Sequence, residues 1–545
     1  MDRRDFVRTG AVAGIMAVRG KPLTAEMPAD NARSGGVNER HGISPFVLEE
    51  ATLADLQAGM SSGRMTSHSI TEQYIVRIEE LNRRGPNLRH VLEVNPEALD
   101  IADLLDRERK TGRVRGPLHG IPILLKDNID TADRMTTTAG SLALEGSVPL
   151  QDAFIAAKLR AAGAVLLGKA NLSEWANFRS THSSSGWSGR GGQAKNPYVL
   201  DRNPCGSSSG SGGAVSANLC AAAIGTETDG SIVCPSAANG IVGIKPTVGL
   251  VSRSGIIPIS HTQDTAGPMA RTVTDAVIIL NALAGIDPRD SATLATRSRP
   301  QVDYTRSLDP TGLRGARIGV ARTKFFGYSD VADKIVNDAI EVMKAQGAVI
   351  VDPANIETAG KFDDSEFDVL LYEFKADLNS YLAGLGPKAK MRTLQDIIDF
   401  NDRHAEREMP WFGQEIFLMA QKKGPLSEKK YRDALAKDLR MSRAQGIDAT
   451  MNKHKLEAIV APTGSPPWAT DLVNGDHYTG ASSTPPAVAG YPNINVPAGY
   501  SHNLPVGISF FGRAYSEPTL IRLAFAYEQA SRHRRAPQFI PTLAD

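Results

Sequence analysis

The chain lacks most features that mark specialised classes of protein. Aromatic residues make up only 6% of its 545 residues, and Lys plus Arg number 61 against 60 for Asp plus Glu. This balance excludes the strong positive field that holds nucleic acid or anionic lipid. No apolar run approaches the roughly 18 residues that a membrane-spanning helix needs. We therefore expect neither nucleic acid nor a membrane among its partners.

Cysteine is also scarce. Cys205, Cys220 and Cys234 are the only three, too few for a disulfide framework, and none has the C-x-x-C spacing of a metal site. The eleven histidines are scattered, and no H-E-x-x-H motif occurs. We therefore expect no metal and no cofactor, and we expect Cys234 to pack as a small apolar side chain.

The N-terminus resembles a twin-arginine export signal. Arg3 and Arg4 form the basic pair, Phe6 follows, and a mildly apolar stretch covers residues 9–18. The alternative is an ordinary basic amphipathic N-terminus on a cytoplasmic protein. We predict a signal peptide over residues 1–30 and a periplasmic or secreted protein. Export in the folded state would also carry unpaired, buried cysteines into an oxidising compartment.

Hydrophobic residues at 41% and charged residues at 22% are typical of a globular protein. Short apolar runs at 121–125 and 164–167 predict buried strands, and residues 152–162 between them predict a helix. Strands that alternate with helices indicate an α/β sheet covered on both faces. Residues 52–84 have a helical pattern with Ser67 as a plausible N-cap. No linker divides the chain, so we predict one catalytic domain over residues 45–540.

Residues 180–213 hold nine Ser and eight Gly in 34 positions. A flexible linker is one interpretation. However, apolar segments flank this stretch closely, and a loop of this length inside a compact domain is more often functional.

Two motifs within the chain resemble known sites but fit them poorly. Residues 163–169 match a phosphate-binding loop until Ala170, which cannot supply the hydroxyl that binds Mg²⁺. Residues 206–210 match G-x-S-x-G with Ser208 as the nucleophile, and His533 could complete an esterase site. That motif needs a strand directly before it, whereas Asn203-Pro204 precedes this one. The esterase remains a minor alternative.

Three stretches carry the strongest indication of chemistry. Lys126 ends the apolar run of GIPILLKDN, where a desolvated lysine would act as a neutral base rather than extend to solvent. The second stretch is CGSSSGSGG at 205–213. The third is GTETDGSIVCP at 225–235, where Ser231 stands at the entry to a short helix that Gly240 ends. Ser231 is therefore either an N-cap or a nucleophile beside N–H groups that stabilise an oxyanion.

Together these stretches resemble the amidase signature family, the Ser–Ser–Lys hydrolases. The family pattern has a Gly/Ser-rich run with two adjacent serines, a G-T-D-x-G-G-S segment, and an upstream lysine at the end of a strand. Lys126 matches the lysine, Ser207 matches the first serine, and Ser231 lies 24 residues later. The resemblance is strong over about residues 50–280 and weaker in the C-terminal half.

Several positions depart from the commonest family pattern. Glu227 replaces an Asp, Asp229 replaces a Gly, and Val233 replaces an Arg. The segments TETDGSIVCP and CGSSSGS look like the peptide amidase branch, which removes the C-terminal amide of peptides. The departures therefore bear on the substrate rather than on the reaction.

The resemblance implies an α/β fold with a large mixed central sheet covered by helices on both faces. It also implies that Ser231 attacks the amide carbonyl, while Ser207, which a cis peptide bond holds in the family, relays a proton to Lys126. The oxyanion hole would consist of the backbone N–H groups of Thr228, Asp229, Gly230 and Ser231.

Other polar residues near these motifs have less defined roles. Ser208 is expected to form hydrogen bonds behind the reacting groups and is a candidate substrate-binding residue. The side chain of Asp229 either contacts substrate or caps the helix. His119, His182 and His261 are not required by the chemistry and are expected to be structural.

The expected partner is a small peptide amide or another amide, and the expected assembly is a monomer or homodimer. Alternative substrates are aryl amides, fatty acyl amides and oligoamides. A component of a tRNA amidotransferase is a further alternative, which the neutral charge balance and the export signal oppose. A noncatalytic member of the family is disfavoured because Lys126, Ser207 and Ser231 are all present.

Overall fold

The computed structural model describes residues 45–299 and 302–543, which belong to one compact unit. The predicted signal peptide at 1–30 lies outside the described residues. Within them, no helix is both long and apolar enough to span a membrane.

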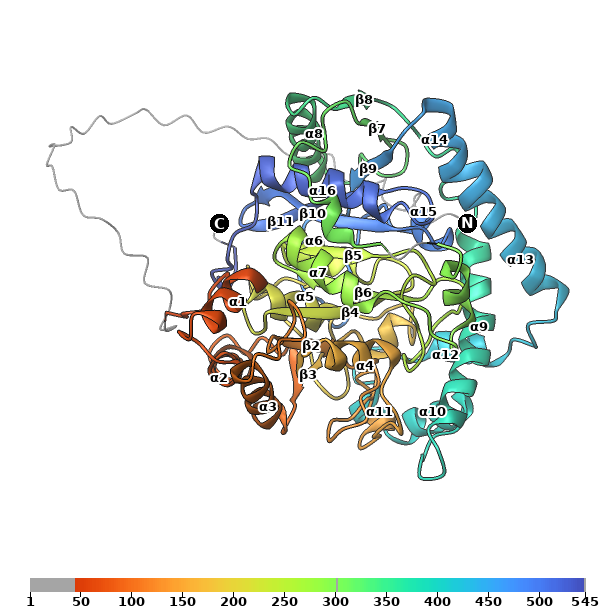
Figure 1. Cartoon of the computed structure of the whole chain (residues 1–545). Coiled ribbons are helices and arrows are strands. Elements are labelled where there is room, and N and C mark those ends of the chain that lie inside the picture. Colours follow the sequence, from red (N-terminus) through yellow and green to blue (C-terminus); the bar gives the residue numbers. More distant parts are fainter. Residues whose placement is uncertain (1–44, 300–301, 544–545) are drawn as a thin grey trace, which may run out of the picture. The chain divides into compact units, whose positions relative to one another are not determined.

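A mixed sheet of 11 strands runs through this unit (Figure 1). In spatial order the strands are β1 (Val91–Val94), β3 (Val165–Ala170), β2 (Pro122–Lys126), β4 (Ala222–Glu227), β6 (Thr265–Ala270), β5 (Val242–Lys245), β10 (Asn493–Ser501), β11 (Leu504–Phe511), β9 (Ala458–Pro462), β7 (Arg317–Val320) and β8 (Val349–Val351). The β3–β2–β4 pairs and the β9–β7–β8 pairs are parallel, whereas the pairs from β4 to β9 through the centre are antiparallel.

The helices of the described residues are α1 (Leu53–Ser61), α2 (Ser67–Ile78), α3 (Ala98–Lys110), α4 (Phe154–Ala161), α5 (Ser209–Ser216), α6 (Val233–Ala238), α7 (Val273–Leu283), α8 (Asp330–Ala345), α9 (Asp363–Gly384), α10 (Leu394–Arg403), α11 (Ala405–Glu408), α12 (Glu415–Gln421), α13 (Lys429–Leu439), α14 (Asp448–His454), α15 (Thr484–Val488) and α16 (Glu517–Ser531). Every residue of β2, β3, β4 and β6 is buried. Because successive side chains of a strand point to opposite faces, both faces of these strands are covered. This confirms the predicted α/β class with a mixed central sheet.

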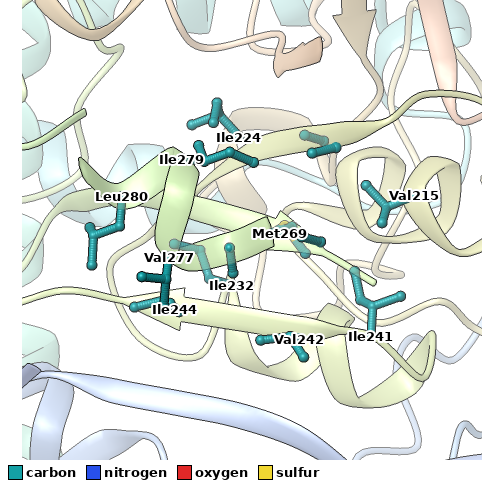
Figure 2. Close-up of a cluster of buried hydrophobic side chains, with 14 of the residues drawn as sticks. Val215, Ile224, Ile232, Ile241, Val242, Ile244, Met269, Val277, Ile279 and Leu280 are labelled. Atoms are coloured by element: carbon teal, nitrogen blue, oxygen red, sulfur yellow. The ribbon is translucent and has the colours of Figure 1, made fainter. Parts of the chain in front are cut away.

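The core beneath the segments that carry Lys126 and Ser231 is formed by apolar side chains from the central strands and from α7. Figure 2 shows Ile224 of β4, Ile244 of β5 and Met269 of β6 beside Val277 and Leu280 of α7, and all five are fully buried. This packing makes the ends of β2 and β4 a rigid support for the segments that follow them.

The local predictions agree with the structure in part. The runs at 121–125 and 164–167 form β2 and β3, with α4 between them. The predicted helix over 52–84 is instead two helices, and the N-cap of α2 is Thr66 rather than Ser67. The reason is that the Thr66 hydroxyl accepts the N–H of Ser69 at 3.0 Å, whereas the Ser67 hydroxyl donates to the Gly120 carbonyl.

Candidate active site

Lys126 lies at the end of β2 and is fully buried. Its Nζ is 2.8 Å from Ser207 Oγ and 2.8 Å from Thr226 Oγ1, and the Thr226 carbonyl oxygen is 3.3 Å away. Burial lowers the pKa of Lys126 from 10.5 to about 7, against the opposing effect of the nearby Asp264 and Glu227. A substantial fraction of Lys126 is therefore neutral near pH 7 and able to accept a proton.

Ser207 lies in the loop before α5, and the Gly206–Ser207 peptide bond is cis, as the resemblance implies. A backbone hydrogen bond fixes this loop, because the Ser173 N–H donates to the Ser207 carbonyl at 3.0 Å. Any Cβ on Gly206 would collide with the Ser173 side chain. Glycine at 206 is therefore required by this close approach.

Ser208 connects the cis-peptide loop to the stretch at residues 225–235, which carries both Thr226 and Ser231. Its N–H donates to the Ser231 carbonyl at 3.1 Å, and its hydroxyl donates to the Thr226 carbonyl at 3.0 Å. Ser208 is fully buried, and its hydroxyl also accepts the Thr226 N–H at 3.2 Å. Ser208 therefore links the two segments from within the protein interior and is not exposed to substrate.

The turn between β4 and α6 carries Ser231. Glu227 closes this turn because its Oε2 accepts the N–H groups of Ile232 and Val233 at 2.8 and 3.0 Å. Gly230 adopts a φ of 78°, a conformation that favours glycine. The α6 helix (Val233–Ala238) follows with Asn239 as its C-cap, and Gly240 comes directly after it, as the sequence predicts.

The turn presents unused hydrogen-bond donors. Among the described residues, no hydrogen bond starts from the backbone N–H groups of Thr228, Asp229, Gly230 or Ser231. All four residues line a cavity of about 340 Å³, and Ser231 is 8% exposed. A cavity wall with clustered free N–H groups suits a negatively charged oxygen.

Two acidic side chains stabilise this turn from outside. Asp264 accepts the Thr228 hydroxyl at 2.6 Å, and burial raises the pKa of Asp264 to about 6. Asp229 accepts the Thr484 hydroxyl at 2.7 Å. Burial raises the pKa of Asp229, whereas the Ser483 and Thr484 hydroxyls lower it. Asp229 therefore anchors the turn to the start of α15 through its side chain.

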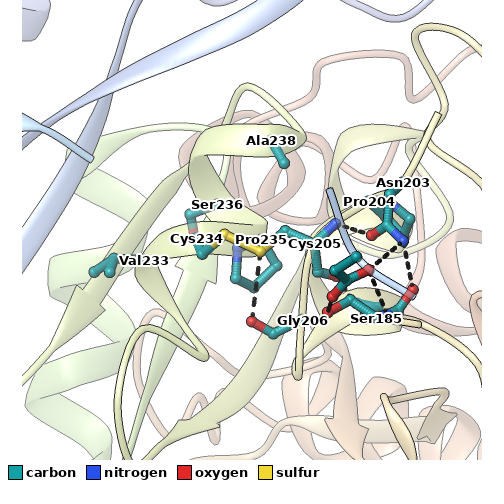
Figure 3. The surroundings of a disulfide bond; sticks show 12 residues. Ser185, Asn203, Pro204, Cys205, Gly206, Val233, Cys234, Pro235, Ser236 and Ala238 are labelled. Atoms are coloured by element: carbon teal, nitrogen blue, oxygen red, sulfur yellow. Dashed lines mark hydrogen bonds between the residues drawn. A yellow bond between two sulfur atoms is a disulfide. The ribbon is translucent and has the colours of Figure 1, made fainter. Parts of the chain in front are cut away.

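A disulfide bond joins Cys205 to Cys234, with a Cα–Cα distance of 6.0 Å (Figure 3). The predictions of unpaired cysteines and of Cys234 as a simple apolar residue were therefore wrong; only Cys220 is free, and it is buried. The segments that carry the two cysteines are also joined by the hydrogen bond from the Ser208 N–H to the Ser231 carbonyl. The disulfide links the loop that contains Ser207 to α6, the helix that follows Ser231.

The remaining sequence motifs do not form the sites that they resemble. Residues 163–169 run into β3 rather than into a phosphate-binding loop. His533 lines a different cavity, with Glu50 and Arg271, so the structure does not bring it to Ser208. His119 bonds the Leu105 carbonyl at 2.9 Å in the interior.

One cluster of the described residues has metal-ligand atoms within 4.8 Å of one another, namely His261, Glu373 and Asp377. His261 Nδ1 is 2.8 Å from Asp377 Oδ2, and Tyr431 donates to Glu373 at 2.7 Å. Hydrogen bonds within the protein therefore account for this arrangement, and we assign no metal to it.

Sequence reasoning missed several residues that the fold brings to the site. Thr226 and Asp264 contact the lysine and the turn, and Trp468 and Asp476 reach the cavity from a distant loop. Thr226 lies in the stretch at 225–235, and Asp264 lies within residues 50–280, over which the family resemblance is strong, so that signal could have found them. Trp468 and Asp476 carry no local signal.

Comparison with known proteins identifies the family. A sequence profile described as Amidase matches residues 69–521. A probable amidase of Arabidopsis thaliana is 45% identical over 515 residues, which covers 93% of this chain and 95% of the relative. The native peptide amidase of Stenotrophomonas maltophilia has a solved structure with a TM-score of 0.87 at 51% identity, covering 91% of this chain and 100% of that one.

Another relative is a component of the glutamyl-tRNA(Gln) amidotransferase of Chloroflexus aurantiacus, which is 35% identical over 510 residues, covering 90% of this chain and 99% of the relative. The chain belongs to the amidase signature family. It is an enzyme that hydrolyses amides.

Proposed function

We propose that this enzyme hydrolyses the C-terminal carboxamide of peptides to the free acid and ammonia, with Ser231, Ser207 and Lys126 as its catalytic residues. The observation that carries the proposal is the 2.8 Å contact of the buried Lys126 with Ser207, in a loop bonded to the backbone of Ser231. The 51% identity to a protein named peptide amidase supports the substrate class.

The contact between Lys126 and Ser207 supports the following acylation step. Ser231 Oγ attacks the carbonyl carbon as its proton passes to Ser207 Oγ, and the proton of Ser207 passes to the neutral Lys126 Nζ. When the tetrahedral intermediate collapses, the C–N bond breaks. Lys126 returns its proton through Ser207 to the departing nitrogen, which leaves as ammonia. Water, activated by the same relay, then cleaves the acyl-enzyme.

The free N–H groups of the 228–231 turn stabilise the negative oxygen that develops in both steps. Removal of one such donor costs about 10²- to 10³-fold in kcat in other serine hydrolases. Glu227 holds the turn closed through Ile232 and Val233. Its carboxylate therefore acts as a positioning group for the oxyanion hole.

The decisive experiment measures ammonia release from C-terminally amidated di- and tripeptides by wild-type and Ser231→Ala protein. We expect release by the wild type and its loss in the variant. Release that Ser231→Ala leaves unchanged would remove Ser231 as the nucleophile. Hydrolysis of aryl or fatty acyl amides without release from peptide amides would assign the enzyme to those substrates instead.

The similarity to the glutamyl-tRNA(Gln) amidotransferase component favours a second candidate, transfer of ammonia to an acceptor. That activity needs partner chains, whereas the proposed hydrolysis needs none. Peptide-amide hydrolysis by the isolated chain therefore separates the two candidates.

The proposed site of action is the periplasm, reached through the twin-arginine signal at 1–30. The Cys205–Cys234 disulfide supports this location because disulfides form and persist in oxidising compartments. A cytoplasmic enzyme is the alternative.

A further inference from the structure

The loop between β9 and α15, residues 463–483, forms part of the cavity that Ser231 lines. It contributes Trp468, Asp476, Tyr478 and Ser483 to the cavity wall. Apart from two isolated β-bridges, the loop has no strand or helix. Long irregular loops inside a compact domain are commonly functional, and the contacts of this loop indicate its role.

Asp476 fixes the loop to the segment that leads into the cis peptide bond. Its carboxylate accepts the Trp468 indole N–H at 3.2 Å, the Ser185 N–H and hydroxyl at 2.9 and 2.5 Å, and the Asn203 side-chain amide at 3.2 Å. Asn203 Oδ1 in turn accepts the Cys205 N–H at 2.8 Å (Figure 3). One carboxylate thus holds three segments together beside the active site.

The indole of Trp468 is fixed in two directions. Its N–H bonds Asp476, and its apolar surface packs in one cluster with Ala238 and the Cys205–Cys234 disulfide. Tyr478 meets it edge-on, with ring centroids 5.6 Å apart. A side chain held in this way offers a preorganised apolar surface.

Other elements add apolar side chains to the same cavity. These side chains are Phe178, Ile259 and Leu370. The cavity therefore has a polar region, the 228–231 turn, and an apolar region dominated by aromatic rings. Its volume of about 340 Å³ is sufficient for a large side chain beside the scissile carbonyl.

We propose that the apolar region binds the side chain of the residue that bears the carboxamide, with Trp468 as its main contact. This inference rests on the proposed function. The enzyme prefers C-terminal amides of large apolar and aromatic residues to glycinamides. Asp476 is the positioning residue that keeps the indole in place.

The physical reason lies in the short distance between the two parts of the substrate. The side chain branches from the carbon next to the scissile carbonyl, so it meets the cavity wall when that carbonyl reaches Ser231. Each methylene accommodated in an apolar pocket changes kcat/KM by about 10- to 200-fold. A phenylalanyl side chain against two aromatic rings should therefore be favoured over glycine by at least about 100-fold.

The test compares ammonia release from N-acetyl-phenylalaninamide and N-acetyl-glycinamide by the purified, oxidised protein, with kcat and KM measured separately. The variants are Trp468→Ala and Asp476→Asn. Trp411→Ala serves as the matched control because Trp411 is 46% exposed and does not line the cavity. The decisive readout is the ratio of kcat/KM for the two substrates, which partial unfolding leaves unchanged.

We expect a wild-type ratio of at least about 100, a ratio below about 10 for Trp468→Ala, and the wild-type ratio for Trp411→Ala. Asp476→Asn should raise KM for the phenylalaninamide several-fold more than KM for the glycinamide. A wild-type ratio near 1, an unchanged ratio in Trp468→Ala, or equal losses for both substrates in Asp476→Asn overturns the inference while the proposed function stands. Absence of ammonia from both substrates overturns the proposed function and this inference with it.

Discussion

The pH dependence of the reaction follows from the burial of Lys126. Its pKa falls from 10.5 to about 7, and only the neutral amine can accept a proton from Ser207. An amine with that pKa is about one-tenth neutral at pH 6, half neutral at pH 7 and nine-tenths neutral at pH 8. A solvated lysine would be neutral in about one molecule in 3,000 at pH 7. We therefore expect kcat/KM to rise about fivefold from pH 6 to 7 and less than about twofold from pH 7 to 8.

Substitution of a neighbouring charge should move this profile. Asp264 raises the pKa of Lys126 because its negative charge stabilises the ammonium form. Asp264→Asn should therefore shift the inflection toward lower pH, by about half a unit to one unit. The loss of the carboxylate that holds Thr228 will also reduce the rate, but the position of the inflection does not depend on the maximum rate.

The assay is steady-state ammonia release between pH 5 and 9, with kcat/KM plotted against pH for wild type and variant. Asp338→Asn is the control, because Asp338 is an exposed residue of α8 that pairs with Lys334. An activity that stays constant down to pH 5 would refute the assignment of Lys126 as the base. An inflection that moves to higher pH in Asp264→Asn would refute the electrostatic reasoning.

Three further outcomes are expected. Folded Lys126 binds fewer protons than unfolded Lys126 below pH 10.5, so its burial costs about 4 kcal/mol at pH 7 and about 2 kcal/mol at pH 9. Lys126→Met should abolish activity. The difference in unfolding free energy between this variant and wild type, measured by urea titration, should fall by about 2 kcal/mol from pH 7 to pH 9. A difference that stays constant with pH would contradict the shifted pKa of Lys126. Cys234→Ser opens a disulfide of sequence separation 29 and should lower the unfolding free energy by about 3 kcal/mol and reduce kcat, whereas Cys220→Ala should preserve kcat. Replacement of Arg3 and Arg4 by Lys should retain the protein in the cytoplasm, as cell fractionation would show; unchanged export would exclude the twin-arginine route.

The site combines unstable local features with a rigid surrounding. A buried lysine and unpaired N–H groups each cost free energy, whereas glycine at 230 accommodates the positive φ of the turn without steric cost. The fully buried strands β2 and β4 support them from the core, and the disulfide and Glu227 support them at the turn. The structure thus holds the groups that we propose to be catalytic in fixed positions, which is the condition for electrostatic stabilisation of the reaction.

The sequence by itself determined the features whose causes are local. The short apolar run after Gly120 predicts a buried strand, and that strand forms with Lys126 at its end. Gly240 ends α6 because glycine adopts the positive φ of 60° found there. The spacing of Ser207 and Ser231, with the pattern around them, was enough to indicate the family.

Only the tertiary structure decided which distant segments meet. The pairing of Cys205 with Cys234 requires that two segments 29 residues apart pack side by side, and a count of three cysteines does not reveal it. The low pKa of Lys126 arises from burial by β4 and the cis-peptide loop, which lie about 80 to 100 residues along the chain. Trp468 lines the cavity with its indole N–H bonded to Asp476, and no local sequence pattern indicates either residue. Periodicity and turn chemistry act over a few residues, whereas burial and electrostatic contact depend on neighbours that only the folded chain assembles.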